Sequence, residues 1–147
     1  MIPLRDENPT LHTCWVTYLL VGLNIAAWVF LQGAGMYPEL ARSIWQYGLI
    51  PAEWLGRVSP GTRVSAGKGL VAVLDGEPNR WSVLTSMFMH GGWFHLIGNM
   101  WFLLVFADNV EDAMGPWRFA AFYLLCGLAA AAAQIVASPG SVMPMVG

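Results

Sequence analysis

Charged residues are scarce in this 147-residue sequence, and this scarcity decides its class. Only 11% of the residues are charged, 56% are hydrophobic, and the mean hydropathy is +0.53. A soluble domain carries about 25% charged residues, which it needs to cover its surface with hydrated groups. The composition therefore excludes an ordinary soluble domain and predicts a protein that resides in a lipid bilayer.

Cysteines and clustered basic residues are also rare. Cys14 and Cys126 are too few for a disulfide framework and lack the spacing of a metal site. The net charge is −2 and no basic patch is present, which argues against nucleic acid as a partner. The polar, acidic opening from Met1 to Thr10 lacks the basic segment with which a secretory signal peptide begins.

What the sequence does have is uncharged runs that are long enough to cross a bilayer. Such a crossing takes about 20 residues of helix. The runs free of charge are Trp15–Met36, Trp81–Ala107 and Phe119–Gly147. We predict an all-α membrane protein with a polar tail at 1–14 and transmembrane helices at about 15–35, 92–107 and 117–137.

The segment between the first two predicted helices, 36–91, is more than a linker. It interleaves Trp45 and Trp54 with the charged residues Glu53 and Arg57. Aromatic and charged side chains in this mixture are typical of a segment at the level of the lipid headgroups. Residues 59–69, rich in glycine and other turn formers, indicate exposed turns. We expect a long, partly interfacial first loop.

Two polar side chains within the second predicted helix indicate function. His95 and Asn99 are four residues apart, so both project from one helix face. An ionisable residue inside a membrane is costly and favours a functional role. Together the two side chains could donate hydrogen bonds into a small polar cavity. Packing remains an alternative, because a transmembrane Asn often bridges helices at about 1 kcal/mol, and the chain would then be an unrelated three-helix membrane protein.

Other chemistry is less well supported by the residues. A metal site made of His90, His95 and Asp108 is disfavoured, because the two histidines lie on different helix faces and Asp108 is three turns away. Ser138 and Ser141 follow the third predicted helix in a Pro/Gly-rich turn with no identifiable base beside them. The residues by themselves predict a donor-lined pocket without a complete reaction centre.

A continuous run of motifs carries a family resemblance. It extends from Thr85 to Leu103, continues through Phe106–Gly115 with a Glu-x-x-x-Gly turn, and reaches Tyr123–Gly127. This run resembles the domain of rhomboid intramembrane serine proteases. The resemblance implies a bundle of six transmembrane helices, of which this chain is the N-terminal half.

The resemblance also implies a catalytic serine–histidine dyad. The family's serine lies in a Gly-x-Ser-Gly motif at the start of the fourth helix, and its histidine lies on the sixth. Gly147 stands where the first glycine of that motif is expected, so the nucleophile would follow two residues later. Residues 1–147 alone are therefore expected to be inactive, and the family needs neither a metal nor a cofactor.

The resemblance assigns further roles residue by residue. His95 and Asn99 correspond to the oxyanion-hole donors, and His90 to a structural position that ties the first loop to the second helix. The supporting positions are Trp81, where many members have Trp-Arg and this chain has Trp-Ser, and Glu111 and Gly115 of the turn after that helix.

The implied partners are the lipid bilayer and transmembrane protein substrates, cut in or near their membrane helices. The alternative is a catalytically inactive rhomboid-like membrane protein that binds transmembrane clients. The expected location is the bacterial inner membrane, with the N-terminus in the cytoplasm. The excess of basic residues in the first loop favours the opposite orientation, because positively charged loops tend to stay in the cytoplasm.

Overall fold

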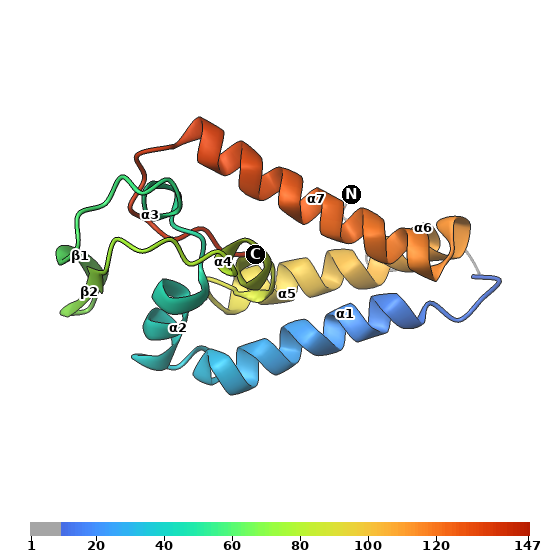
Figure 1. Ribbon diagram of the computed structural model, residues 1–147. Coiled ribbons are helices and arrows are strands. Elements are labelled where there is room, and N and C mark those ends of the chain that lie inside the picture. Colours follow the sequence, from blue (N-terminus) through green and yellow to red (C-terminus); the bar gives the residue numbers. More distant parts are fainter. Residues whose placement is uncertain (1–9) are drawn as a thin grey trace.

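The computed structural model describes residues 10–147 and is mostly helical. Three long helices run alongside one another (Figure 1): α1 (Trp15–Ala26), α5 (Trp93–Phe102) and α7 (Pro116–Ala137). A π-helical turn, η1 (Ala27–Leu31), prolongs α1, and a short 3₁₀ turn, η2 (Gly33–Gly35), follows. The first helix therefore ends about four residues earlier than the sequence predicted.

The second predicted helix is longer than expected. A π-helical turn, η4 (Leu103–Ala107), leads from α5 directly into α6 (Asp108–Met114). Helical structure ends at Gly115, whose φ of 81° lies in the left-handed region that glycine adopts without strain. Pro116 then begins α7, a position that suits proline because its missing N–H would be unpaired there.

One of these helices has the dimensions of a membrane span. Among the described residues, α7 is long and apolar enough to cross a bilayer, whereas the apolar helix Trp15–Leu31 is shorter. Trp15 and Trp117 pack edge to face at one end of the helices, and Trp28 and Trp93 do so at the other. Tryptophan is enriched at both boundaries between lipid and water, so this distribution suits a membrane protein. Three crossings remain a prediction.

The first loop contains the main departure from the predicted all-α fold. Its elements are α2 (Glu39–Tyr47), α3 (Pro51–Trp54), β1 (Thr62–Gly67), β2 (Leu70–Leu74), α4 (Ser82–Thr85) and η3 (Ser86–Phe88). The two strands form an antiparallel hairpin in which Arg63 lies opposite Val73 and Ser65 opposite Val71.

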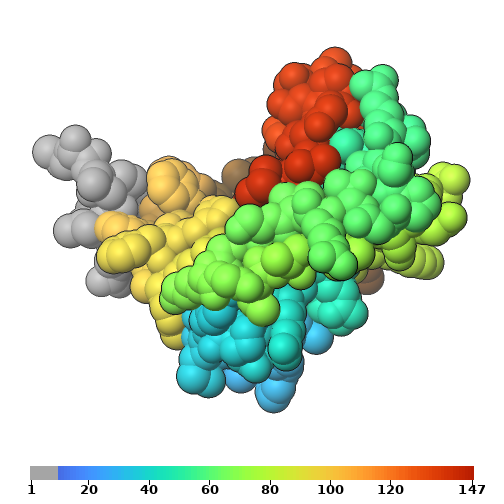
Figure 2. Space-filling model, turned by 90° about the vertical axis from the view of Figure 1, so that its left-hand side faces the viewer, coloured from blue at the N-terminus to red at the C-terminus, as the bar shows by residue number. Residues whose placement is uncertain are grey.

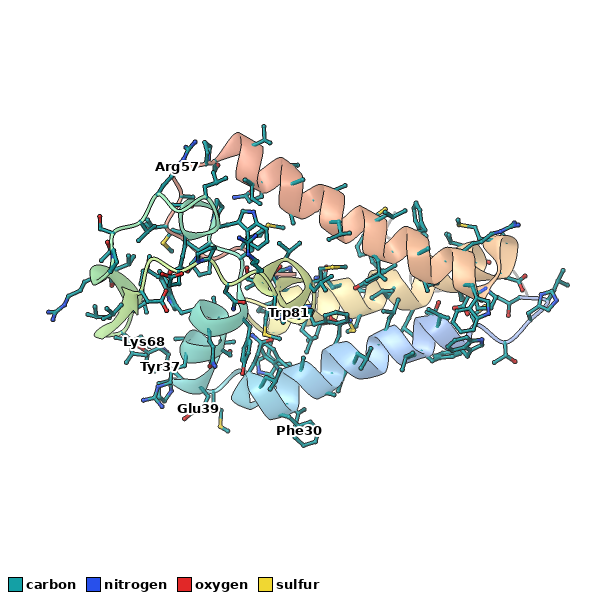
Figure 3. All side chains as sticks on the ribbon, viewed as in Figure 1. Phe30, Tyr37, Glu39, Arg57, Lys68 and Trp81 are labelled. Carbon is teal, nitrogen blue, oxygen red and sulfur yellow. The ribbon has the colours of Figure 1, made fainter. Side chains whose placement is uncertain are left out.

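The hairpin corrects the expectation of exposed turns at 59–69. Alternate residues along β1 and β2 are half-buried or buried, and those between them are exposed. This alternation is the pattern of a strand with one covered face. Glycine and proline at the start of the segment obscured it. The hairpin lies beyond the ends of the long helices (Figure 1), where the Tyr37 hydroxyl donates to the Gly67 carbonyl at 2.5 Å. Figure 3 shows Lys68 beside Tyr37, with its ammonium group 4.9 Å from the ring centroid.

Two small apolar clusters hold the long helices together. Val16, Leu20, Ala107 and Phe119 pack α1, η4 and α7 against one another near α6. The second cluster, near the first loop, packs η1 against α5 through Trp28, Leu96 and Met100.

Candidate functional site

His90 lies in the short connection before α5, and its backbone is held from both sides by one side chain. The Gln32 amide donates to the His90 carbonyl at 2.7 Å, and the His90 N–H donates to the Gln32 Oε1 at 2.9 Å. Both residues are buried. Gln32 was not predicted from the sequence as a site residue, although a glutamine at the end of an apolar run was an available signal.

The two histidines are in ring contact. Their centroids are 5.2 Å apart with an interplanar angle of 65°. The Gly91 N–H donates to His95 Nδ1 at 3.3 Å. A ring nitrogen that accepts carries no proton, so the donor N–H of His95 is on Nε2. This is the form of imidazole that can donate a hydrogen bond to a reacting oxygen.

The His90 imidazole is electrically neutral at neutral pH. Burial, aided by the neighbouring His95 ring, lowers the pKa of His90 to about 4. Desolvation disfavours the charged form of a base, which is the direction seen here. Among the described residues, no hydrogen-bond partner exists for His90 Nδ1.

A cavity of about 420 Å³ separates α7 from α5 and η4. Its lining is largely apolar, and the polar side chains and backbone that reach it are those of Asn24, His90, Asn99, Tyr123 and Gly147. Asn24 is buried on α1 and donates to the Leu20 carbonyl of its own helix at 2.8 Å. Asn24 was not predicted from the sequence as a site residue, although it is an amide within a predicted span.

The structure brings Gly147 to the same cavity. Its N–H donates to the Ser86 carbonyl at 2.8 Å. A Cβ added at this position would lie 2.4 Å from the Met89 carbonyl oxygen and 3.5 Å from His90 Nε2. The backbone at residue 147 thus passes tightly beside His90, where a side chain has no room.

Of the predicted oxyanion donors, Asn99 faces the cavity, whereas His95 is not among the residues that line it. His95 is instead in ring contact with His90. The Ser86 hydroxyl donates to the Val83 carbonyl at 3.3 Å and is therefore not paired with a histidine. Within the described part of the chain, no group of three His, Cys, Asp or Glu side chains is placed to hold a metal ion.

The remaining predicted residues are not among those that line the cavity. Trp81 precedes α4 and is 72% exposed. Glu111 and Gly115 lie at the opposite end of the helices. There the buried Glu111 carboxylate accepts the Val16 N–H at 3.0 Å and the Thr17 N–H and hydroxyl at 2.7 and 2.8 Å. These backbone donors belong to the unpaired first turn of α1, so Glu111 caps that helix from a distant part of the chain.

Comparison with known proteins identifies the family. The family model for the Rhomboid domain matches residues 77–147. Residues 77–147 belong to the rhomboid family. The match includes the His90–Asn99 segment, α6 and Gly147, and so covers the cavity apart from Asn24.

The relatives found are plant proteins from Arabidopsis thaliana. RHOMBOID-like protein 6, mitochondrial, is 22% identical over 135 residues, which is 84% of this chain and 44% of the relative. RHOMBOID-like protein 5 is 35% identical over 52 residues (35% of this chain, 17% of the relative), and Inactive RHOMBOID-like protein 8 is 40% identical over 48 (33% and 14%). The chain spans less than half the length of these curated relatives. No solved structure matches. The plant relatives lend no support to the predicted bacterial membrane.

Proposed function

We propose that this chain forms the N-terminal half of a rhomboid-type intramembrane serine endopeptidase, which cleaves membrane-anchored proteins in or near their transmembrane helices. The observation that carries the proposal is the meeting of His90, Asn99 and Gly147 at one cavity, inside the segment that matches the Rhomboid domain. The proposed partners are the bilayer and transmembrane protein substrates. The proposed membrane crossings are residues 15–31, 93–107 and 116–137.

The proposed chemistry is stabilisation of an oxyanion. Attack of a serine on a peptide carbonyl places negative charge on the carbonyl oxygen, and fixed donors in a water-poor site stabilise that charge. The Asn99 amide and the Nε2–H of His95 supply such donors without adding a competing negative charge. For His95 to take part, its ring must reach past His90 to the cavity when substrate is bound.

The nucleophile and its base are proposed to come from elsewhere in the complete protein. In the family the serine follows two residues after the glycine that Gly147 matches, and the histidine lies on a later helix. The tight backbone at Gly147, beside His90, suits a turn that presents the next residues to the cavity. Residues 1–147 alone are proposed to be inactive.

A second candidate is a catalytically inactive rhomboid-like membrane protein that binds transmembrane clients. One relative, 40% identical over 48 residues, carries the word inactive in its name. In that case the donors at the cavity would serve packing, and the chain would bind a client without cutting it.

Turnover of a fluorogenic transmembrane substrate by the full-length protein in detergent micelles distinguishes the two candidates. The protease proposal expects cleavage that a mechanism-based serine-hydrolase inhibitor abolishes, and that residues 1–147 by themselves do not support. Substrate that binds and stays intact would contradict the protease and favour the client-binding protein. Cleavage that the inhibitor leaves unchanged would contradict serine chemistry.

A further inference from the structure

Backbone groups of the first loop hold the segment that follows α7, residues 141–147. The Leu49 N–H donates to the Met145 carbonyl at 3.0 Å and the Met145 N–H to the Leu49 carbonyl at 2.8 Å, which makes an antiparallel bridge. The Ala52 N–H donates to the Ser141 carbonyl at 3.0 Å. Figure 2 shows the first loop, in green, against the C-terminal residues, in red.

Gly48 lies directly against residues 144 and 145. Its φ of −72° and ψ of 155° suit any residue, so the requirement for glycine here is steric rather than conformational. An added Cβ would lie 2.9 Å from the Pro144 Cβ, 3.1 Å from the Met145 carbonyl oxygen and 2.4 Å from the Ile44 carbonyl oxygen. Any side chain at position 48 would therefore clash both with the end of α2 and with residues 144 and 145.

The other end of this segment is anchored as well. Gly147 is bonded through its N–H to the Ser86 carbonyl and is confined by Met89. Ser86 and His90 belong to the end of the first loop, and Gln32 fixes the His90 backbone. Two separate stretches of the first loop, 48–52 and 86–90, thus set the path of residues 141–147 between them.

We infer that the first loop is a positioning element of the proposed active site and that Gly48 is a positioning residue. The absence of a side chain at Gly48 allows Leu49 to pair with Met145, and this pairing sets where Gly147 lies against His90 and Asn99. The inference rests on the proposed function, because the group that benefits from this placement is the serine expected after Gly147. A misplacement of about 1 Å at reacting groups can cost about 100-fold in rate.

Two glycine-to-alanine variants of the full-length protein test the inference. Gly48→Ala introduces the clash, whereas Gly140→Ala makes the same chemical change in the turn after α7, where a Cβ meets no atom within 4 Å. The measurements are kcat and KM on a fluorogenic transmembrane substrate, well below the unfolding temperature of each variant, and hydrogen exchange of the Met145 amide.

We expect Gly48→Ala to lower kcat by about tenfold with KM within about twofold, and to speed exchange of the Met145 amide by about tenfold. Gly140→Ala should leave all three within about twofold. Met145→Pro, which removes the donor to Leu49 without bulk at position 48, should lower kcat similarly and serves if Gly48→Ala does not fold.

An unchanged kcat in Gly48→Ala, or an equal loss in Gly140→Ala, overturns the positioning role. If the unaltered protein has no turnover at all, the proposed function fails and the exchange data decide the inference alone. Faster exchange at Met145 in Gly48→Ala then still supports the positioning of residues 141–147 by the first loop, and unchanged exchange overturns it.

Discussion

The two ends of the helical bundle differ in whether their buried polar groups are hydrogen-bonded. Near α6, the Glu111 carboxylate accepts three hydrogen bonds, and Asp112 accepts the Leu11 and His12 N–H groups at 2.9 and 2.8 Å. Near the first loop, within the described part of the chain, the buried atoms His90 Nδ1 and Trp28 Nε1 have no hydrogen-bond partner, and Asn99 lines the cavity. Satisfied buried groups stabilise a fold, whereas open donors beside a cavity are free to bind something else. We therefore expect substitutions at the α6 end to change stability and those at the cavity end to change activity.

The largest effect is expected at the cavity. Asn99→Ala in the full-length protein should lower kcat by about 10²- to 10³-fold, the usual cost of removing one oxyanion donor. The thermal unfolding midpoint should change little, because the described residues offer the Asn99 side chain no bond to lose. A large loss of stability with proportionate loss of activity would instead assign Asn99 to helix packing.

At the opposite end, Glu111→Ala should destabilise the fold by about 3 kcal/mol, because it leaves the buried Val16 and Thr17 N–H groups unpaired. Thermal unfolding in detergent measures this loss. Below the lowered midpoint, kcat should stay within about twofold of the unaltered protein. Glu77→Ala, the same change at an exposed residue of the first loop, serves as the control and should leave the midpoint unchanged. A fall in the kcat of Glu111→Ala below its unfolding midpoint would contradict the separation of stability and activity between the two ends.

Acid should affect the cavity end before the α6 end. His90 has its pKa lowered from 6.5 to about 4 by burial, so the unfolded chain binds a proton more readily than the folded one. The free energy of unfolding should therefore fall as the pH drops from about 6.5 towards 4. The difference between unaltered protein and His90→Gln isolates this contribution, and a difference that is constant with pH would contradict it.

The smallest expected effect is at Asp112. Hydrogen bonds from the Leu11 and His12 backbone, and from the His12 ring, hold the pKa of this half-buried carboxylate below its usual range. A group whose folded pKa is depressed contributes stability above its ordinary pKa, and that stability disappears as the pH falls through the folded value. The Leu11 amide chemical shift should report this titration at a pH lower than that of a free aspartate. In Asp112→Asn the transition should vanish.

The part of the candidate site that was predicted from the sequence lies on one helix, where the structure places Asn99 at the cavity but His95 against His90. His95 and Asn99 share a face by their spacing alone, and the motif around them is continuous along the chain. Gln32 and Asn24 were missed because each reaches its place only when α1 packs beside the connection that carries His90. The hairpin of β1 and β2 was missed because turn-forming residues preceded a short alternating pattern.

The sequence by itself indicated the membrane class, through the scarcity of charge, and the approximate positions of the three long helices, through the uncharged runs. It also determined the family, because the motif run is local. Only the tertiary structure decided that Glu111 caps α1, that Gln32 bonds to the His90 backbone, and that the missing side chain at Gly48 leaves room for Met145. These contacts join residues far apart in the chain, and most involve backbone N–H and carbonyl groups. Every residue type except proline carries both groups, so they leave no signature in the sequence and are selected only by how the helices pack.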